Sequence, residues 1–393
     1  MPALEILFWT SLVILFYCYA GYGILLYLVN KIALFFKSSL PIAASGYTPS
    51  VTFIVAAYNE EVVLEEKIQN TLSLDYPAGK LQIIFITDGS TDNSIDVVKK
   101  YPSIMLLHRV ERTGKSAAIK RAMRFVETPL VIFSDANALL NKDCIKAIVK
   151  HFDDERVGGV AGEKKILNDH PSAVGAAEGL YWKYESFMKK QDADFNTVVG
   201  AAGELYSIRT ELFQEFNDQV ILDDFVISMS ICLQGYRFNY EPGAYAIEAP
   251  SASLSDEQRR KIRISAGAYQ SIGYLKEGLN IFKNPSLSFQ YISRRLLRWV
   301  ACPFLLVILF FTNILLVING ASANYSYFLV IQLAFYFLAL CGCLFICRGW
   351  KNIILNVPFY FVFMNVCLVN GFFNYIKGSQ TVLWKKSLRE AME

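Results

Sequence analysis

The sequence contains little histidine and little net charge. Only three histidines occur, and none lies near cysteines at the spacing of a zinc site. The net charge is only +3, which argues against a general nucleic-acid-binding protein, so we expect no nucleic-acid partner. Most cysteines lie in or beside apolar runs, and Cys144 and Cys232 are the exceptions. We therefore predict reduced, structural thiols rather than a disulfide framework or a metal site.

Apolar residues, in contrast, make up 54% of the chain, more than the roughly 45–50% of soluble proteins. Residues 6–29 carry no charge and would span roughly 36 Å as a helix, enough to cross a bilayer. Lys31 and Lys37 follow this run, and the positive-inside rule places the next domain in the cytoplasm. The alternative is a cleaved signal peptide, but no basic segment precedes the run and no small-residue cleavage site follows it.

Three further apolar runs lie at residues 301–319, 328–346 and 353–373. If all four runs crossed the membrane, the basic C-terminal tail would lie outside, against the positive-inside rule. We expect residues 353–373 not to cross, because this run contains Pro358 and three asparagines. Such a segment is tolerated at membrane depth where it packs on protein.

Residues 285–300 combine Arg294, Arg295 and Arg298 with leucine, tyrosine and tryptophan. This mixture predicts an amphipathic helix in the cytoplasmic interface, with its arginines on anionic headgroups. An ordinary surface helix is the alternative.

The polar middle of the chain repeats a strand, a polar turn and a helix four times, with strands expected at residues 51–57, 81–86, 105–108 and 130–133. This alternation predicts an α/β fold with a doubly wound sheet. In such sheets, ligands bind beyond the carboxyl ends of the strands. Carboxylates, amides or a lysine follow each strand, which suits a nucleotide and a divalent metal. Taken singly, Asp88 is also a common turn residue, and Asn59 and Glu60 could cap a helix.

The ordered set of motifs resembles the membrane-bound branch of family 2 of inverting glycosyltransferases, which includes cellulose, hyaluronan and poly-N-acetylglucosamine synthases. The resemblance implies a GT-A fold that binds a nucleotide-sugar, usually a UDP-sugar. The donor-binding positions that it implies are Ala57, Tyr58, Asn59, Glu60, Asp88, Lys115 and Asp135.

Two acidic motifs carry the chemistry in this resemblance. Asp135 and Asn137 match the family's Asp-x-Asp motif, with asparagine in the second place, and imply a Mg²⁺ or Mn²⁺ site held by oxygen ligands. Asp223 and Asp224, shortly before a Gly-Tyr pair, match the catalytic motif. Asp224 is then the base that takes the proton of the acceptor hydroxyl, and Asp223 stands in place of the usual glutamate.

The acceptor side is implied by three further segments. The first resembles a glycine-rich acceptor segment, Gly200, Ala201, Ala202, Gly203 and Glu204, whose alternative interpretation is a mere turn. In the second, Arg260 and Arg263 match arginines that bind the pyrophosphate, and Ile264 replaces a tryptophan that stacks on the acceptor sugar. A solvated or lipid-facing basic helix is the alternative there. In the third, Trp384 begins a segment that in relatives reaches the active site.

These observations predict an anchor at residues 1–37, a GT-A domain at 48–284, an interfacial helix at 285–300, a membrane region at 301–376 and a cytoplasmic tail at 377–393. We expect an inner (plasma) membrane enzyme that transfers a sugar to a lipid-linked or growing glycan acceptor and contacts membrane lipids. A processive synthase is one alternative, weakened by Ile264, and a catalytically silent membrane scaffold is another.

Overall fold

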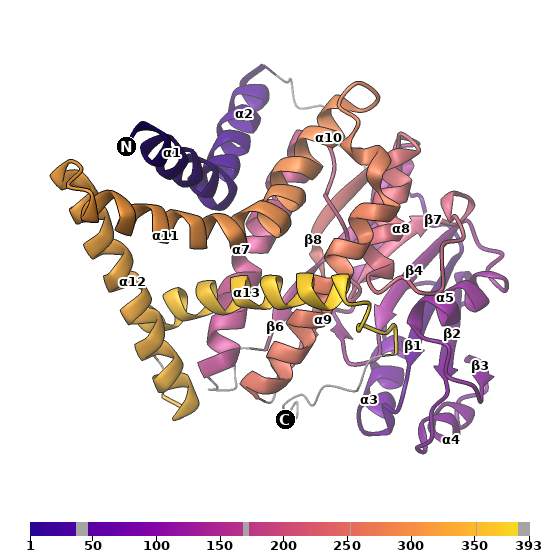
Figure 1. Cartoon of the computed structure of the whole chain (residues 1–393). Coiled ribbons are helices and arrows are strands. Elements are labelled where there is room, and N and C mark those ends of the chain that lie inside the picture. The colour runs from indigo at the N-terminus through magenta and orange to yellow at the C-terminus, as the bar shows by residue number, and fades with distance from the viewer. Residues whose placement is uncertain (37–45, 168–172, 252, 351, 384–393) are drawn as a thin grey trace.

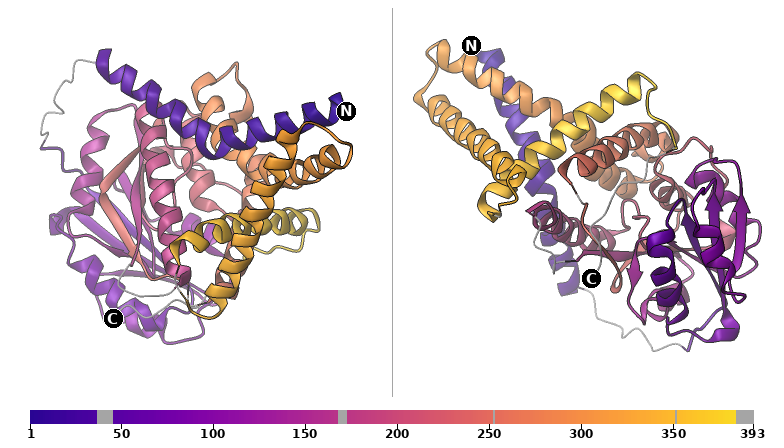
Figure 2. Two further views of the ribbon diagram at one scale, coloured as in Figure 1. Left: turned by 90° about the vertical axis from the view of Figure 1, so that its left-hand side faces the viewer. Right: turned by 90° about the horizontal axis from the view of Figure 1, so that it is seen from below.

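The computed structural model describes residues 1–36, 46–167, 173–251, 253–350 and 352–383. It consists of an α/β domain and a group of long apolar helices that project from one side of it (Figures 1 and 2).

Four strands form the parallel half of the sheet: β1 (Val51–Ala57), β2 (Leu81–Asp88), β3 (Met105–Arg109) and β4 (Leu130–Asp135). The helices α3 (Glu61–Leu72), α4 (Ser94–Lys99) and α5 (Lys115–Met123) alternate with them. The order β3-β2-β1-β4 is that of a doubly wound sheet, because the chain reverses direction beside β1. The predicted strands are confirmed, and β2 and β4 extend as far as the aspartates at their carboxyl ends.

The other half makes the sheet mixed. Beyond β4 lie β7 (Tyr206–Arg209), β6 (Val157–Ile166), β8 (Arg237–Glu248) and β5 (Leu139–Leu140), with β7 antiparallel to both of its neighbours. The helices of this half are α6 (Cys144–Val149), α7 (Ala173–Phe195), α8 (Asp223–Leu233) and α9 (Leu254–Tyr274). The prediction of a doubly wound sheet thus describes the first half of a mixed sheet.

The first apolar run forms α1 (Pro2–Phe16), a π-helical turn at Tyr17–Gly21 and α2 (Tyr22–Phe36). The chain bends between α1 and α2 (Figure 1), as π-helical turns permit. α2 lies against α7, where the Tyr22 hydroxyl donates to Asp192 at 2.6 Å and the Asn30 amide donates to the Gln191 carbonyl at 2.9 Å. The N-terminal segment is therefore packed onto the α/β domain as well as onto the apolar helices.

Residues 285–318 are continuous helix, comprising α10 (Pro285–Tyr291), a π-helical stretch at Ile292–Ala301 and α11 (Cys302–Ile318). The expectation that its arginines lie on the anionic headgroups of the membrane surface is wrong. Arg294 donates to Glu185 at 2.7 Å and to Asp192 at 3.1 Å, and Arg298 donates to Glu185 at 2.7 Å. Two carboxylates of α7 attract the guanidinium groups because ion pairs are far stronger in the interior than at the surface.

In the described residues, four helices are long and apolar enough to cross a membrane: Pro2–Phe36, Pro285–Ile318, Ala323–Cys347 (α12) and Ile354–Ile376 within α13 (Ile353–Ile376). The first end of α12 meets α1, where Tyr325 packs on Phe8 and accepts a bond from Trp9. The second end packs on the α/β domain, since Ile346 clusters with residues of α7, α9 and α13.

α13 is the most deeply packed of these helices. It lies along α9, and its Asn356 and Asn365 are buried. Tyr19 donates to Asn365 at 2.7 Å. The chain then reaches the α/β domain, because a methyl group added to Gly114 would lie 3.5 Å from Val382.

We predict that Glu185→Gln destabilises the protein by about 3–5 kcal/mol, because three buried arginines would lose a shared carboxylate. Thermal unfolding in detergent measures the effect. The matched control is Glu277→Gln, which removes an exposed partner of Lys283 and should cost at most about 1 kcal/mol. Equal midpoints for the two variants would contradict the importance of the buried network.

Candidate functional site

The loops after β1 and β2 are tied together at the carboxyl edge of the sheet. Asn59 adopts a left-handed conformation, with φ of 54°, and its side-chain oxygen accepts from the Thr91 N–H at 2.8 Å. The Asn59 N–H in turn donates to the Ser90 hydroxyl at 3.2 Å. Asparagine tolerates this conformation better than most residues, which explains its place at the turn.

Asp88, at the end of β2, holds the loop that precedes α5. Its buried carboxylate accepts from the Gly114 N–H at 2.6 Å and from the N–H and hydroxyl of Thr113 at 2.9 and 2.8 Å. In the same loop the Arg112 guanidinium lies 3.6 Å from the centre of the Tyr58 ring. The predicted donor positions therefore converge, and the structure shows Asp88 positioning the loop.

Charges of both signs meet at the centre of this edge. The Lys115 ammonium bonds Asp135 at 2.6 Å and lies 3.9 Å from Asp223. A Cβ on Gly203 would lie 3.0 Å from Lys115 Nζ, 3.3 Å from Asp135 Oδ2 and 3.4 Å from Asp224 Oδ2. The glycine-rich segment thus passes directly beside the carboxylates, and any side chain at position 203 would crowd them.

The electrostatics fit acid–base chemistry. Burial and the repulsion of Asp223 raise the pKa of Asp224 to about 7, against the attraction of Lys115. Burial also raises the pKa of Asp223. Burial alone would lower the pKa of Lys115, but the three nearby aspartates outweigh it and raise that pKa. Asp224 is therefore tuned near neutral pH, where a carboxylate is an effective base.

A second acidic group adjoins Asp135. Carboxylate oxygens of Asp135, Glu204 and Glu248 lie within 4.8 Å of one another, which is a donor set suited to a hard divalent cation. Lys164 bonds Glu204 and bonds Glu248 at 2.6 Å, and Lys115 bonds Asp135. Among the described residues, Glu204 Oε2 is buried without a hydrogen-bond partner, so one ligand atom stays available. Sequence reasoning missed Glu248 and Lys164; the position of Glu248 at the end of an alternating strand was the available signal.

The glycine-rich segment is fixed against α8. Gly200 has a φ of 89°, and a Cβ there would overlap the ring of Phe225, the residue after Asp224. Ser228 accepts from the Ala201 N–H at 2.9 Å and donates to the Asp224 carbonyl at 2.7 Å. The segment and the first turn of α8 therefore form one unit.

The two predicted arginines of α9 have different neighbours. Arg263 lies among the carboxylates, and the attraction of Asp223 and Asp224 opposes the burial that lowers its pKa. Arg260 instead bonds Glu178 at 2.5 Å and Glu257 at 2.9 Å. The structure thus brings Arg263 to the site and commits Arg260 to an ion-pair cluster beside it. Trp384 lies outside the described residues.

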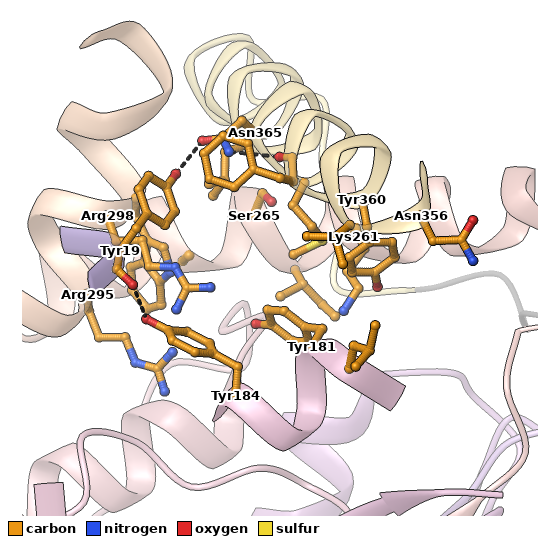
Figure 3. A pocket seen from close by; sticks show the side chains of 18 residues that line it. Tyr19, Tyr181, Tyr184, Lys261, Ser265, Arg295, Arg298, Asn356, Tyr360 and Asn365 are labelled. Carbon is orange, nitrogen blue, oxygen red and sulfur yellow. Dashed lines mark hydrogen bonds between the residues drawn. The ribbon is translucent and has the colours of Figure 1, made fainter. Parts of the chain in front are cut away.

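Ile264 lines a cavity of about 400 Å³ between the α/β domain and the apolar helices (Figure 3). Its walls come from α7, α9, α13 and the helix 285–318. Arg263, the neighbour of Ile264 in sequence, lies near the carboxylates, so the cavity and the acidic cluster are adjacent along α9.

Comparison with known proteins agrees with this geometry. Residues 52–216 match the model of "Glycosyl transferase family 2". This part of the chain is therefore similar in sequence to family 2 glycosyltransferases. The match includes β1, β2, β4 and the glycine-rich segment.

Curated relatives of the chain include poly-beta-1,6-N-acetyl-D-glucosamine synthase of Staphylococcus aureus, which is 26% identical over 56% of this chain and 55% of the relative. Beta-monoglucosyldiacylglycerol synthase of Nostoc sp. is 28% identical over 48% of this chain and 42% of the relative. The chain thus spans about half the length of the curated relatives it matches.

A solved mannosyltransferase of Pyrobaculum calidifontis, in complex with GDP-Man and Mn²⁺, is 22% identical and superposes with a TM-score of 0.72. The superposition covers 95% of this chain and 100% of the mannosyltransferase chain. The protein therefore has the GT-A fold, with apolar helices toward both ends.

We predict that Gly200→Ala destabilises the protein and weakens nucleotide binding, because the new methyl group would displace Phe225 beside Asp224. Gly235→Ala is the matched control, since Gly235 has a similar φ of 95° but open space around its Cβ. The control should cost only about 1–2 kcal/mol for its left-handed backbone. Thermal unfolding and nucleotide titration compare the two variants, and equal losses would refute the steric explanation.

Proposed function

We propose that the protein transfers a sugar, with inversion, from a nucleotide-sugar, most simply a UDP-sugar, to a lipid-linked or glycan acceptor at the membrane. One observation carries the proposal: the Asp224 carboxylate, Lys115 and Asp135 lie close together around Gly203. Asp224 as the base, Lys115 as the cation and Asp135 as the donor-side carboxylate therefore lie together in one small site.

In the proposed reaction, Asp224 removes the proton of an acceptor hydroxyl while that oxygen attacks the anomeric carbon of the donor sugar. The bond from this carbon to the donor phosphate breaks, and the nucleoside diphosphate leaves on the opposite side. A single in-line displacement inverts the anomeric centre. Lys115 and Arg263 are placed to stabilise the negative charge that develops on the leaving group.

The oxygen ligands suit Mg²⁺ or Mn²⁺, which Asp135 would hold with Asn137, Glu204 or Glu248. Such an ion supplies charge neutralisation for the leaving diphosphate. Asn137 in place of a second aspartate lowers the negative charge of the site, so we propose a modest metal affinity.

For the membrane, we propose three crossings and a catalytic domain in the cytoplasm of an inner (plasma) membrane protein. α1, α11 and α12 would cross, because the middle of α1 meets the start of α12 away from the α/β domain (Figure 1). α13 would lie along the cytoplasmic side, because it packs on α9 and leads to Val382 beside Gly114. The basic tail is then cytoplasmic, as its charge requires.

A processive polysaccharide synthase is the second candidate, favoured by the likeness to a poly-beta-1,6-N-acetyl-D-glucosamine synthase. Ile264 offers no aromatic face for a growing glycan, which favours single transfer. Purified protein with membrane lipids, Mg²⁺ or Mn²⁺ and a panel of radiolabelled nucleotide-sugars decides between them. A small lipid-soluble product supports single transfer, a large water-soluble polymer supports the synthase, and no turnover of any donor would leave the silent scaffold.

We predict that Asp224→Asn lowers the transfer rate by about 10²–10⁴-fold while nucleotide affinity stays within a few fold, because the amide cannot accept the proton. Rate and nucleotide titration are measured on the same preparation. Full activity in this variant would show that another group is the base.

We also predict that kcat/KM rises with pH up to about pH 7 and is level above it, because Asp224 must be ionised and its pKa is raised to about 7. Below the pKa the rate should fall about tenfold per pH unit. A profile that is flat between pH 5 and 8 would contradict the assignment.

A further inference from the structure

We propose that the cavity beside Ile264 binds a phosphate group of the acceptor lipid, so that the acceptor carries a phosphate between its hydrocarbon chain and its sugar. This inference rests on the proposed function, whose acceptor class it specifies. The argument comes from the charge of the cavity, its walls and its position.

The cavity has cationic groups at both ends. Arg295 and Arg298 lie at one end and Lys261 at the other, with the tyrosine rings of α7 between them (Figure 3). Among the described residues, no carboxylate lines the cavity. An anion is the complementary ligand, and guanidinium groups bind phosphate oxygens bidentately.

The carboxylates behind the wall do not balance the arginines of residues 285–300, whereas Lys261 at the other end lies 3.5 Å from Glu257. Arg294, Arg295 and Arg298 share two carboxylates, Glu185 and Asp192. Three positive charges against two negative charges leave a surplus beside the cavity. An anionic group bound in the cavity would neutralise this surplus positive charge, and buried charges are costly unless they are paired.

The remaining walls are apolar and aromatic. Val357, Phe361 and Met364 of α13 face Tyr181 and Leu180 of α7. A second hollow, of about 380 Å³, shares Tyr19 and Tyr184 with the cavity and is lined by Ile24, Phe187 and other apolar residues. A charged pocket with apolar surroundings suits an amphiphile better than a free sugar or an ion, because both the anion and the chain find partners.

The position of the cavity connects it to the base. Arg295 donates to the Val199 carbonyl at 3.0 Å, at the start of the glycine-rich segment, and lies 5.8 Å from the Phe225 ring. Phe225 follows Asp224 directly. A sugar attached to a phosphate at Arg295 and Arg298 would therefore extend toward Asp224, and Ile264 leaves room that a tryptophan would fill.

The test measures binding of octadecyl phosphate, octadecanol and inorganic phosphate to the purified full chain by native mass spectrometry. We expect octadecyl phosphate to bind at least about tenfold more tightly than octadecanol, since one charge-assisted bond is worth that much. Arg298→Gln should lose at least about tenfold in affinity, and Lys283→Gln, an exposed lysine away from the cavity, should lose none. Ile264→Trp, which fills the cavity without changing charge, should also weaken binding and serves if Arg298→Gln fails to fold.

Equal binding of octadecanol would overturn the phosphate site, and equal binding of inorganic phosphate would overturn the lipid. Equal losses of affinity in Arg298→Gln and Lys283→Gln would show that binding depends on general surface charge, which would also overturn the phosphate site. Sugar transfer is measured in parallel on the same protein. Lipid phosphate binding without transfer of any sugar would refute the proposed function alone, whereas transfer without lipid phosphate binding would refute this inference alone.

Discussion

The arrangement of the molecule depends on the buried ion-pair network between α7 and the helix 285–318. Glu185 and Asp192 on α7 receive Arg294, Arg295 and Arg298, which lie at the point where that helix leaves the α/β domain for its apolar half. Buried charges are costly unless they are paired with good geometry, so this network permits one arrangement of the two parts. The Tyr22 hydroxyl of α2 also donates a hydrogen bond to Asp192, so three segments distant in sequence meet at this carboxylate.

The same ion-pair network also fixes the position of the proposed catalytic edge. Arg295 holds the Val199 carbonyl, which begins the glycine-rich segment, and that segment passes beside Asp224. A shift of the apolar helices would therefore move the backbone beside the base. Orientation matters in transfer reactions, because a misplacement of about 1 Å can cost orders of magnitude in rate.

The sequence could predict the parallel half of the fold because strand and helix alternate there with short turns. It also predicted that Asp88, Lys115 and Asp135 would share one edge, since parallel strands end on the same side of a sheet. The partners of Arg294 and Arg298 could not be predicted, because Glu185 lies about a hundred residues earlier in the chain. Arg260 and Arg263 illustrate the same limit, because they are one turn apart on α9 but have different partners. Packing against α7 and α13 places Arg260 beside Glu178 and Arg263 near Asp223 and Asp224. Glu248 was missed because its approach to Asp135 depends on how the mixed half of the sheet pairs.

The C-terminal segment has one further consequence. The chain that leaves α13 ends its described course beside Gly114, in the loop that Asp88 holds at the donor edge. The apolar helices are thus joined to the α/β domain at both ends of this region, to α7 through the arginines of residues 285–300 and to the loop before α5 through Val382. The α/β domain is consequently no interchangeable module that could be transplanted onto another anchor. A chimera that kept residues 48–284 and exchanged the rest would lose the contact of Val382 with the loop that Asp88 holds.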